Sequence, residues 1–140
     1  IKTALLYLHM PTFQTFKDLS VTFKTHPVTD DLVCVKDKAA IVQAIQNLIL
    51  TEKGERPFQP TLGCGVRNIL FEPLDYGSAA LIKAEIAETL VTYEPRIQID
   101  TIGCNPDFQN NGFNVELSYQ IVGIDDGRTV AVEFFLERTR

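Results

Sequence analysis

The sequence predicts an α+β fold, with two to three helices packed on a C-terminal three-stranded antiparallel β-meander that has an open edge. Two observations predict it. Apolar residues recur at helical spacing between residues 38 and 93, and after residue 97 the period changes to strict alternation. A helix and a sheet that are each apolar on one side must bury those sides against each other, which gives a two-layer domain.

A length of 140 residues, with 45% apolar and 22% charged residues, fits one globular domain with a sizeable core. We divide it into an N-terminal arm, residues 1–29, and a single α+β domain, residues 30–140. The arm contains an apolar run, Leu5 to Leu8, that needs a surface to cover it. That surface is either a partner or the arm's own domain. Short strands are predicted at residues 21–23 and 32–35.

The first helix is predicted over Lys38 to Leu50, with Asp37 as its N-cap and Gly54 ending it. Its apolar residues form successive i, i+4 rows on one face. They are Ala40, Ile41, Ala44, Ile45, Leu48 and Ile49.

A loop rich in proline and glycine follows, from Glu55 to Gly65, and leads to a short helical piece over residues 66–71. The next helix is predicted to begin at Ser78 as N-cap and to end before Pro95. Its core stripe has the same spacing. The residues are Ala79, Ile82, Ile86, Leu90 and Tyr93.

The last third alternates apolar and polar residues in three strands near residues 97–100, 115–121 and 130–137. Hairpin turns are predicted at residues 110–112 and 125–127, where Gly supplies positive φ. The last strand has no obvious partner on its outer edge. Glu133 and Phe135 face away from the core there, which predicts an edge open to a strand from another subunit.

Composition excludes several functions. The net charge of −5, the pI near 5.0 and the scattered basic residues argue against direct nucleic-acid binding. No apolar run is long enough to insert into a membrane. Cys34, Cys64 and Cys104 are odd in number and widely spaced, so we expect free thiols and neither a metal site nor another cofactor.

Two charged corners are candidate partner-binding sites. Glu94 and Arg96 flank the rigid Pro95. Either the corner holds both charges outward toward a partner, or Arg96 satisfies the carbonyls at the end of the preceding helix. Glu55 and Arg56 precede another proline and are either a second contact or simply a solvated loop.

Catalytic geometry is not evident. Glu55, Glu72 and Glu94 could supply the two carboxylates of a glycosidase, yet nothing in their spacing pairs them. No serine lies in a nucleophile elbow, and the Gly63-Cys64-Gly65 stretch is too short to cradle a nucleotide. The sequence therefore favours a part of an assembly over an enzyme.

The ordered motifs resemble the sheath-initiator or baseplate-wedge family of contractile-tailed bacteriophages, which includes the small baseplate component of type VI secretion systems. The likeness runs from about Phe23 to Tyr119, and the Tyr93 to Ile97 stretch is its most specific part. The other matching pieces are His26-Pro27, Asp31, Ala40-Ile41, Asn47 to Thr51, Gly54 to Phe58, Pro60, Gly63 and Leu70 to Pro73.

The resemblance implies a structural virion protein of the tail baseplate, assembled in the host cytoplasm. It would dock on baseplate wedge proteins and start polymerisation of the tail sheath protein by strand addition to the C-terminal sheet. Tail tube or hub proteins are further partners. Part of the family is called lysozyme-like, so a cell-wall glycosidase acting during infection is the alternative.

Overall fold

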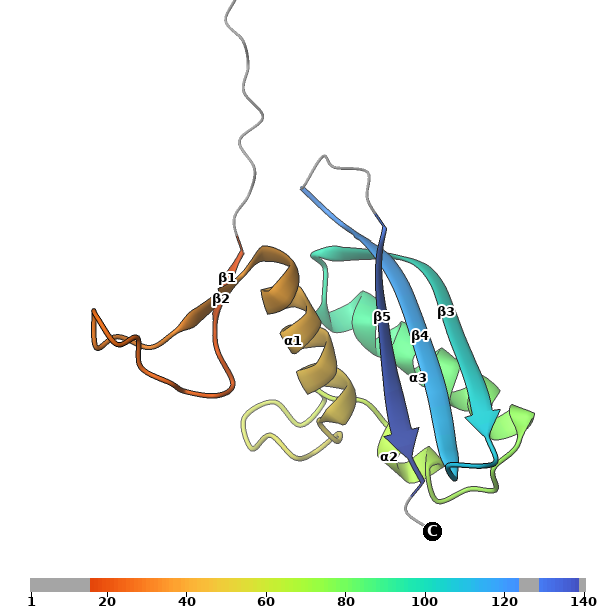
Figure 1. The fold of residues 1–140 in the computed structure, drawn as a ribbon. Helices are drawn as coiled ribbons and strands as arrows, with labels where there is room; N and C mark the ends of the chain where they lie inside the picture. The colour runs from red at the N-terminus through yellow and green to blue at the C-terminus, as the bar shows by residue number, and fades with distance from the viewer. Residues whose placement is uncertain (1–15, 124–128, 139–140) are drawn as a thin grey trace, which may run out of the picture.

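The computed structural model describes residues 16–123 and 129–138 (Figure 1). Three helices and a three-stranded sheet at the C-terminus form an α+β domain, as predicted. The helix α3 runs behind the sheet, and α1 lies beside β5. The elements are β1 (Lys17–Leu19), β2 (Cys34–Lys36), α1 (Asp37–Leu50), α2 (Val66–Ile69), α3 (Tyr76–Tyr93), β3 (Ile97–Asp107), β4 (Gly112–Ile121) and β5 (Val130–Glu137).

The strands β1 and β2 form a separate antiparallel ribbon that projects from the body of the domain (Figure 1). The strand expected at residues 21–23 lies instead at residues 17–19, and residues 21–23 belong to the connection between the two strands. This ribbon joins residues on both sides of position 30, where we divided the arm from the domain. The apolar run at Leu5 to Leu8 falls outside the described residues.

The helix α1 buries the expected face, at Ala40, Ile41, Ile45 and Ile49. The prediction of Asp37 as its N-cap was wrong. The N-cap is Lys36, and no side chain accepts a bond from the first turn. The Asp37 carboxylate instead accepts a hydrogen bond from the amide of Phe16 at 3.2 Å, so it fastens the start of the ribbon to the start of the helix.

The loop between α1 and α2 is held against α3 and against the end of α1. Glu85 on α3 accepts hydrogen bonds from Lys53 Nζ and from the Gly65 amide, at 2.5 and 2.9 Å. The pKa of the Glu85 carboxyl is lowered by these two donors. Gly63 has a φ of +135°, and a Cβ there would lie 2.7 Å from the carbonyl oxygen of Thr51. Glycine is therefore required where the loop returns past the end of α1.

The helix α3 begins earlier than predicted, because Asp75 and not Ser78 is its N-cap. The Asp75 carboxylate accepts a hydrogen bond from the Ser78 amide at 2.7 Å, and Ser78 itself is buried in the first turn. The bond lowers the pKa of Asp75. The predicted end is confirmed: α3 stops at Tyr93, with Glu94 as C-cap before Pro95.

The sheet has the order β3-β4-β5 and is antiparallel throughout, as the meander prediction requires. The strand β3 is longer than expected, because pairing with β4 continues past a register shift between Ile99 and Thr101. Asp100 is the extra residue of this bulge, and after it Ile102 again faces the core. A hairpin is confirmed near residues 110–112, but its turn spans residues 108–111. The prediction that Gly112 supplies the positive φ was wrong, because Asn111 has a φ of +52° and Gly112 is the first residue of β4. The hairpin predicted at residues 125–127 lies outside the described residues.

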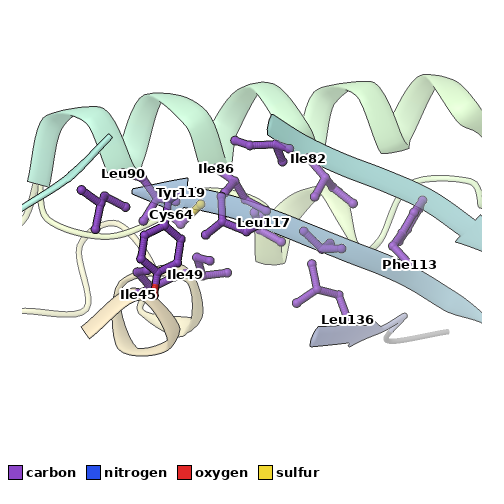
Figure 2. Close-up of a cluster of buried hydrophobic side chains, with 14 of the residues drawn as sticks. Ile45, Ile49, Cys64, Ile82, Ile86, Leu90, Phe113, Leu117, Tyr119 and Leu136 are labelled. Carbon is purple, nitrogen blue, oxygen red and sulfur yellow. The ribbon is translucent and has the colours of Figure 1, made fainter. Parts of the chain in front are cut away.

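The core fills the space between the helices and the sheet (Figure 2). Side chains of α1 and α3 meet Leu117, Tyr119 and other residues of β4, and Leu136 of β5 closes one side. Tyr119 is fully buried, and its hydroxyl has no hydrogen-bond partner among the described residues. Burial, together with the nearby Glu94 charge, raises its pKa. None of the helices described is long and apolar enough to cross a bilayer.

Candidate functional site

The charged corner after α3 does not point outward. Glu94 is only 3% exposed, and Arg96 Nε and Nη2 donate to its two carboxylate oxygens, each at 2.5 Å. Arg96 therefore pairs with its own neighbour rather than with the carbonyls at the end of α3. The paired carboxylate raises the pKa of Arg96. Pro95, between them, is exposed.

Arg96 also contacts the ribbon. Its guanidinium carbon lies 5.6 Å from the centre of the Phe16 ring, within the range of a cation–π interaction. The Asp37 amide donates to the Phe16 carbonyl at 2.7 Å, and the Asp37 carboxylate accepts from the Phe16 amide. Sequence reasoning missed Phe16 because its contact to Arg96 joins positions that are far apart in the chain.

The structure brings together two of the predicted charged motifs. Arg56 of the loop and Glu94 of the corner line one surface groove of about 220 Å³, which we call the corner groove. Asp18 of the ribbon adds a second carboxylate. The other lining residues are Ala44, Asn47, Leu48, Thr51, Leu62 and Tyr93.

Arg56 is exposed and forms no ion pair within the described part of the chain, so its guanidinium is available to a partner. Glu55 is exposed as well, and its carboxylate accepts a hydrogen bond from the Glu52 amide at 3.0 Å. Glu55 thus helps shape the loop that carries Arg56.

The second candidate site is the outer edge of β5. Arg138 N donates to Asn111 O at 3.0 Å, and the register pairs these two positions directly beyond Glu137 and Gly112. Hydrogen-bonded pairs alternate along an antiparallel ladder. The backbone groups of Ala131, Glu133, Phe135 and Glu137 therefore point away from β4, and no described strand pairs with them.

The side chains of β5 face the two sides of the sheet as the alternation in the sequence predicted. Glu133 and Phe135 are exposed on the face opposite the core, while Phe134 is half-buried and Leu136 is buried. The ring of Phe135, 44% exposed, rests on Gly112 of β4, where an added Cβ would overlap it. Phe135 therefore also stabilises the β4–β5 pairing.

The outer edge of β3 is built differently. By the same alternation, Ile102, Cys104 and Pro106 point their backbone groups outward after the bulge at Asp100. Pro106 has no N–H to donate, and a bulge disrupts a regular ladder. The strand β5 has neither a proline nor a register shift. Of the sheet's two edges, β5 is the one suited to pair with another strand.

A groove of about 250 Å³ runs between β5 and α1, and we call it the edge groove. It is lined by Gln46, Ile49, Leu50, Phe134, Phe135 and Leu136. Leu50, on α1, is 69% exposed. Because α1 lies beside β5 (Figure 1), a strand added at this edge would lie next to α1. One row of its side chains would face this groove.

The carboxylates that could serve in catalysis do not lie together in one site. Both carboxylate oxygens of Glu94 are bonded to Arg96, while Glu55 and Glu72 are exposed. In the part of the chain that the structure describes, no three His, Cys, Asp or Glu side chains are placed to hold a metal ion. The three cysteines are free, and burial raises the pKa of Cys104 to about 11.

Comparison with known proteins gives the following likenesses. Residues 35–125 match the family described as baseplate wedge protein gp25. The baseplate wedge protein gp25 of Enterobacteria phage T4 is 29% identical over 87 residues, or 62% of this chain and 66% of that protein. The matched part thus spans just under two thirds of that relative.

Two solved structures share the fold. A chain of the anti-feeding prophage baseplate aligns with a TM-score of 0.69 and 24% identity, covering 81% of this chain and 90% of that one. A Geobacter sulfurreducens protein described as a candidate tail lysozyme aligns with a TM-score of 0.62 and 23% identity, covering 74% and 94%.

Proposed function

The chain belongs to the family of baseplate wedge protein gp25. On this premise we propose that it is a structural component of a contractile phage tail baseplate. It docks on wedge subunits through the corner groove and initiates tail-sheath polymerisation by accepting a strand at the outer edge of β5. The protein is part of the tail baseplate of the virion, and that baseplate is assembled in the host cytoplasm. Tail tube or hub proteins are further partners.

The observation that carries this proposal is the difference between the two edges of the sheet. A free edge offers a row of backbone donors and acceptors, and pairing there gives affinity without a deep pocket. Natural sheets blunt such edges with prolines and bulges. The β3 edge has both, at Pro106 and Asp100, whereas the β5 edge has neither.

Glu133→Pro tests strand addition. The Glu133 N–H points away from β4, so proline removes one outward donor and leaves the β4–β5 hydrogen bonds in place. We expect the variant to fold and to enter baseplates, but sheath should fail to assemble on them, as seen by electron microscopy. Glu133→Ala is the matched control, because it removes the same side chain and keeps the donor. A folded Glu133→Pro protein that still seeds full-length sheath would exclude strand addition at this edge.

Arg56→Ala tests docking at the corner groove. Because the Arg56 guanidinium is exposed and unpaired among the described residues, its removal should leave the fold intact and reduce incorporation into baseplates. Lys83→Ala, which removes an equal charge from an exposed site on α3 outside this groove, is the control. Equal incorporation of the two variants would count against the corner groove.

The cell-wall glycosidase remains the alternative to test. If the protein is structural, purified wild type cleaves no peptidoglycan, and Glu55→Gln, Glu72→Gln and Glu94→Gln change nothing. Hydrolysis by the wild type that one of these substitutions abolishes would reverse the assignment.

A further inference from the structure

The two faces that a strand added beside β5 would meet differ in charge. On the core side an added strand meets the edge groove, where Ile49, Leu50 and Phe134 supply apolar surface. Leu50, at the end of α1, is 69% exposed, so this groove presents apolar surface to solvent. Side chains at alternate positions of an added strand would cover it, since successive side chains of a strand point to opposite faces.

On the other side the added strand meets two carboxylates with the ring of Phe135 between them. Glu133 and Glu137 are exposed on the outer face of β5, and the register places Glu116 of β4 directly opposite Glu133. The three strands contain no lysine or arginine. Like charges directly opposite each other destabilise a sheet. A cation on the next strand would lie beside Glu133 and relieve this repulsion.

We infer that the β5 edge selects an extended segment in which apolar and basic side chains alternate. The apolar row lies over the edge groove, and the basic row lies on the outer face beside Glu133 and Glu137. This inference rests on the proposed strand addition at β5 and names the chemistry of the strand that is added. Backbone pairing supplies the affinity, and the carboxylates select the partner.

Blocked peptides that match the 8 residues of β5 in length test the inference. One alternates Val with Lys, a second alternates Val with Glu, and a third alternates Ser with Lys. Each carries a fluorophore, and binding to the whole protein is followed by anisotropy at low and at high salt. We expect the Val/Lys peptide to bind at least about tenfold more tightly than either of the others, and its advantage over the Val/Glu peptide to shrink with salt.

Paired variants identify the residues responsible. Glu133→Gln with Glu137→Gln should reduce the preference for Lys over Glu to about threefold or less. The matched control, Glu72→Gln with Glu88→Gln, removes the same charge from exposed positions outside the sheet and should retain the preference. If the control variant reduces the preference for Lys equally, the basic peptide is attracted only by the overall negative charge of the protein, and the inference fails.

Other outcomes separate this inference from the function it rests on. If Glu133→Pro abolishes the binding of the Lys and Glu peptides alike, and wild type binds both equally, strand addition stands and charge selection is wrong. If Glu133→Pro changes no binding, the edge is not the site and both ideas fail. A dimer of the protein that the Val/Lys peptide dissociates would show that a second copy fills the edge, against the inference.

Discussion

Replacing Arg96 with alanine should cost more stability than replacing its partner Glu94 with glutamine. The two side chains form a forked pair but are not equally buried, since 29% of the Arg96 side chain and 4% of the Glu94 side chain are exposed. Removing Arg96 leaves a carboxylate with almost no access to water, next to the buried Tyr119. Removing the Glu94 charge leaves a guanidinium that can still reach solvent.

Breaking a fully buried pair by removing one partner costs about 3–5 kcal/mol. Because Arg96 is partly exposed, we expect Arg96→Ala to lower the free energy of unfolding by about 2–4 kcal/mol, including about 0.5–1 kcal/mol for its contact with Phe16. Glu94→Gln keeps a polar group of the same shape and should cost about 1 kcal/mol. Domains of this size are stable by about 5–15 kcal/mol, so both variants still fold.

Urea unfolding followed by circular dichroism measures both values, provided that the slope with denaturant is unchanged. Arg96→Lys keeps the charge and loses the fork, so it should lie between wild type and Arg96→Ala. If Glu94→Gln proves as costly as Arg96→Ala, the burial argument is wrong. The measurement also bears on docking, because reduced entry of Arg96→Ala into baseplates could come from instability alone.

Three further predictions concern the core, the loop and the thiols. Tyr119→Phe removes a buried hydroxyl with no described partner, so thermal unfolding should show a stability that is unchanged or higher by up to about 1 kcal/mol; a loss above that size would reveal a hidden hydrogen bond. Gly63→Ala should cost about 3 kcal/mol in urea, because the added methyl is strained by a φ of +135° and meets Thr51 O at 2.7 Å; near-neutrality would mean that the loop moves freely. Iodoacetamide at pH 8 should label the exposed Cys34 first, whereas Cys104, with a pKa of about 11, holds only about 0.1% thiolate and should react faster as pH rises toward 11. Mass spectrometry of the labelled peptides checks the order, and early labelling of Cys104 would contradict it.

The sequence predicted well what depends on local periodicity. The apolar stripes of α1 and α3 and the alternation in β4 and β5 follow from the spacing of side chains that must face one core. The end of α3 at Pro95 is equally local, because a proline limits the residue before it. These features needed no knowledge of the rest of the chain.

What the sequence could not predict depends on contacts between distant segments. Asp37 looks like an N-cap, yet its carboxylate bonds to Phe16, which a local pattern cannot reveal. Asp75 competed with Ser78 for the start of α3, and both are good capping residues. The meeting of Arg56 with Glu94 in one groove depends on the path of a long loop.

The inward turn of Glu94 could not be predicted for the same reason. A carboxylate and a guanidinium on either side of a proline can face solvent or each other with similar ease. In the fold Arg96 lies over Phe16 and Glu94 lies near Tyr119, and both of these residues come from segments distant in the chain. Of the candidate site, the β5 edge was therefore predictable and the corner groove was not.

The unequal edges of the sheet also bear on how copies of this protein behave toward each other. A subunit with two open edges could join head to tail into an endless ribbon. Here the bulge and Pro106 close one end of such a chain, and if two β5 edges met, Glu133 and Glu137 would bring like charges together. If strand addition occurs at β5 as proposed, each copy would offer one edge for growth, and the number of growing ends would equal the number of copies set in place.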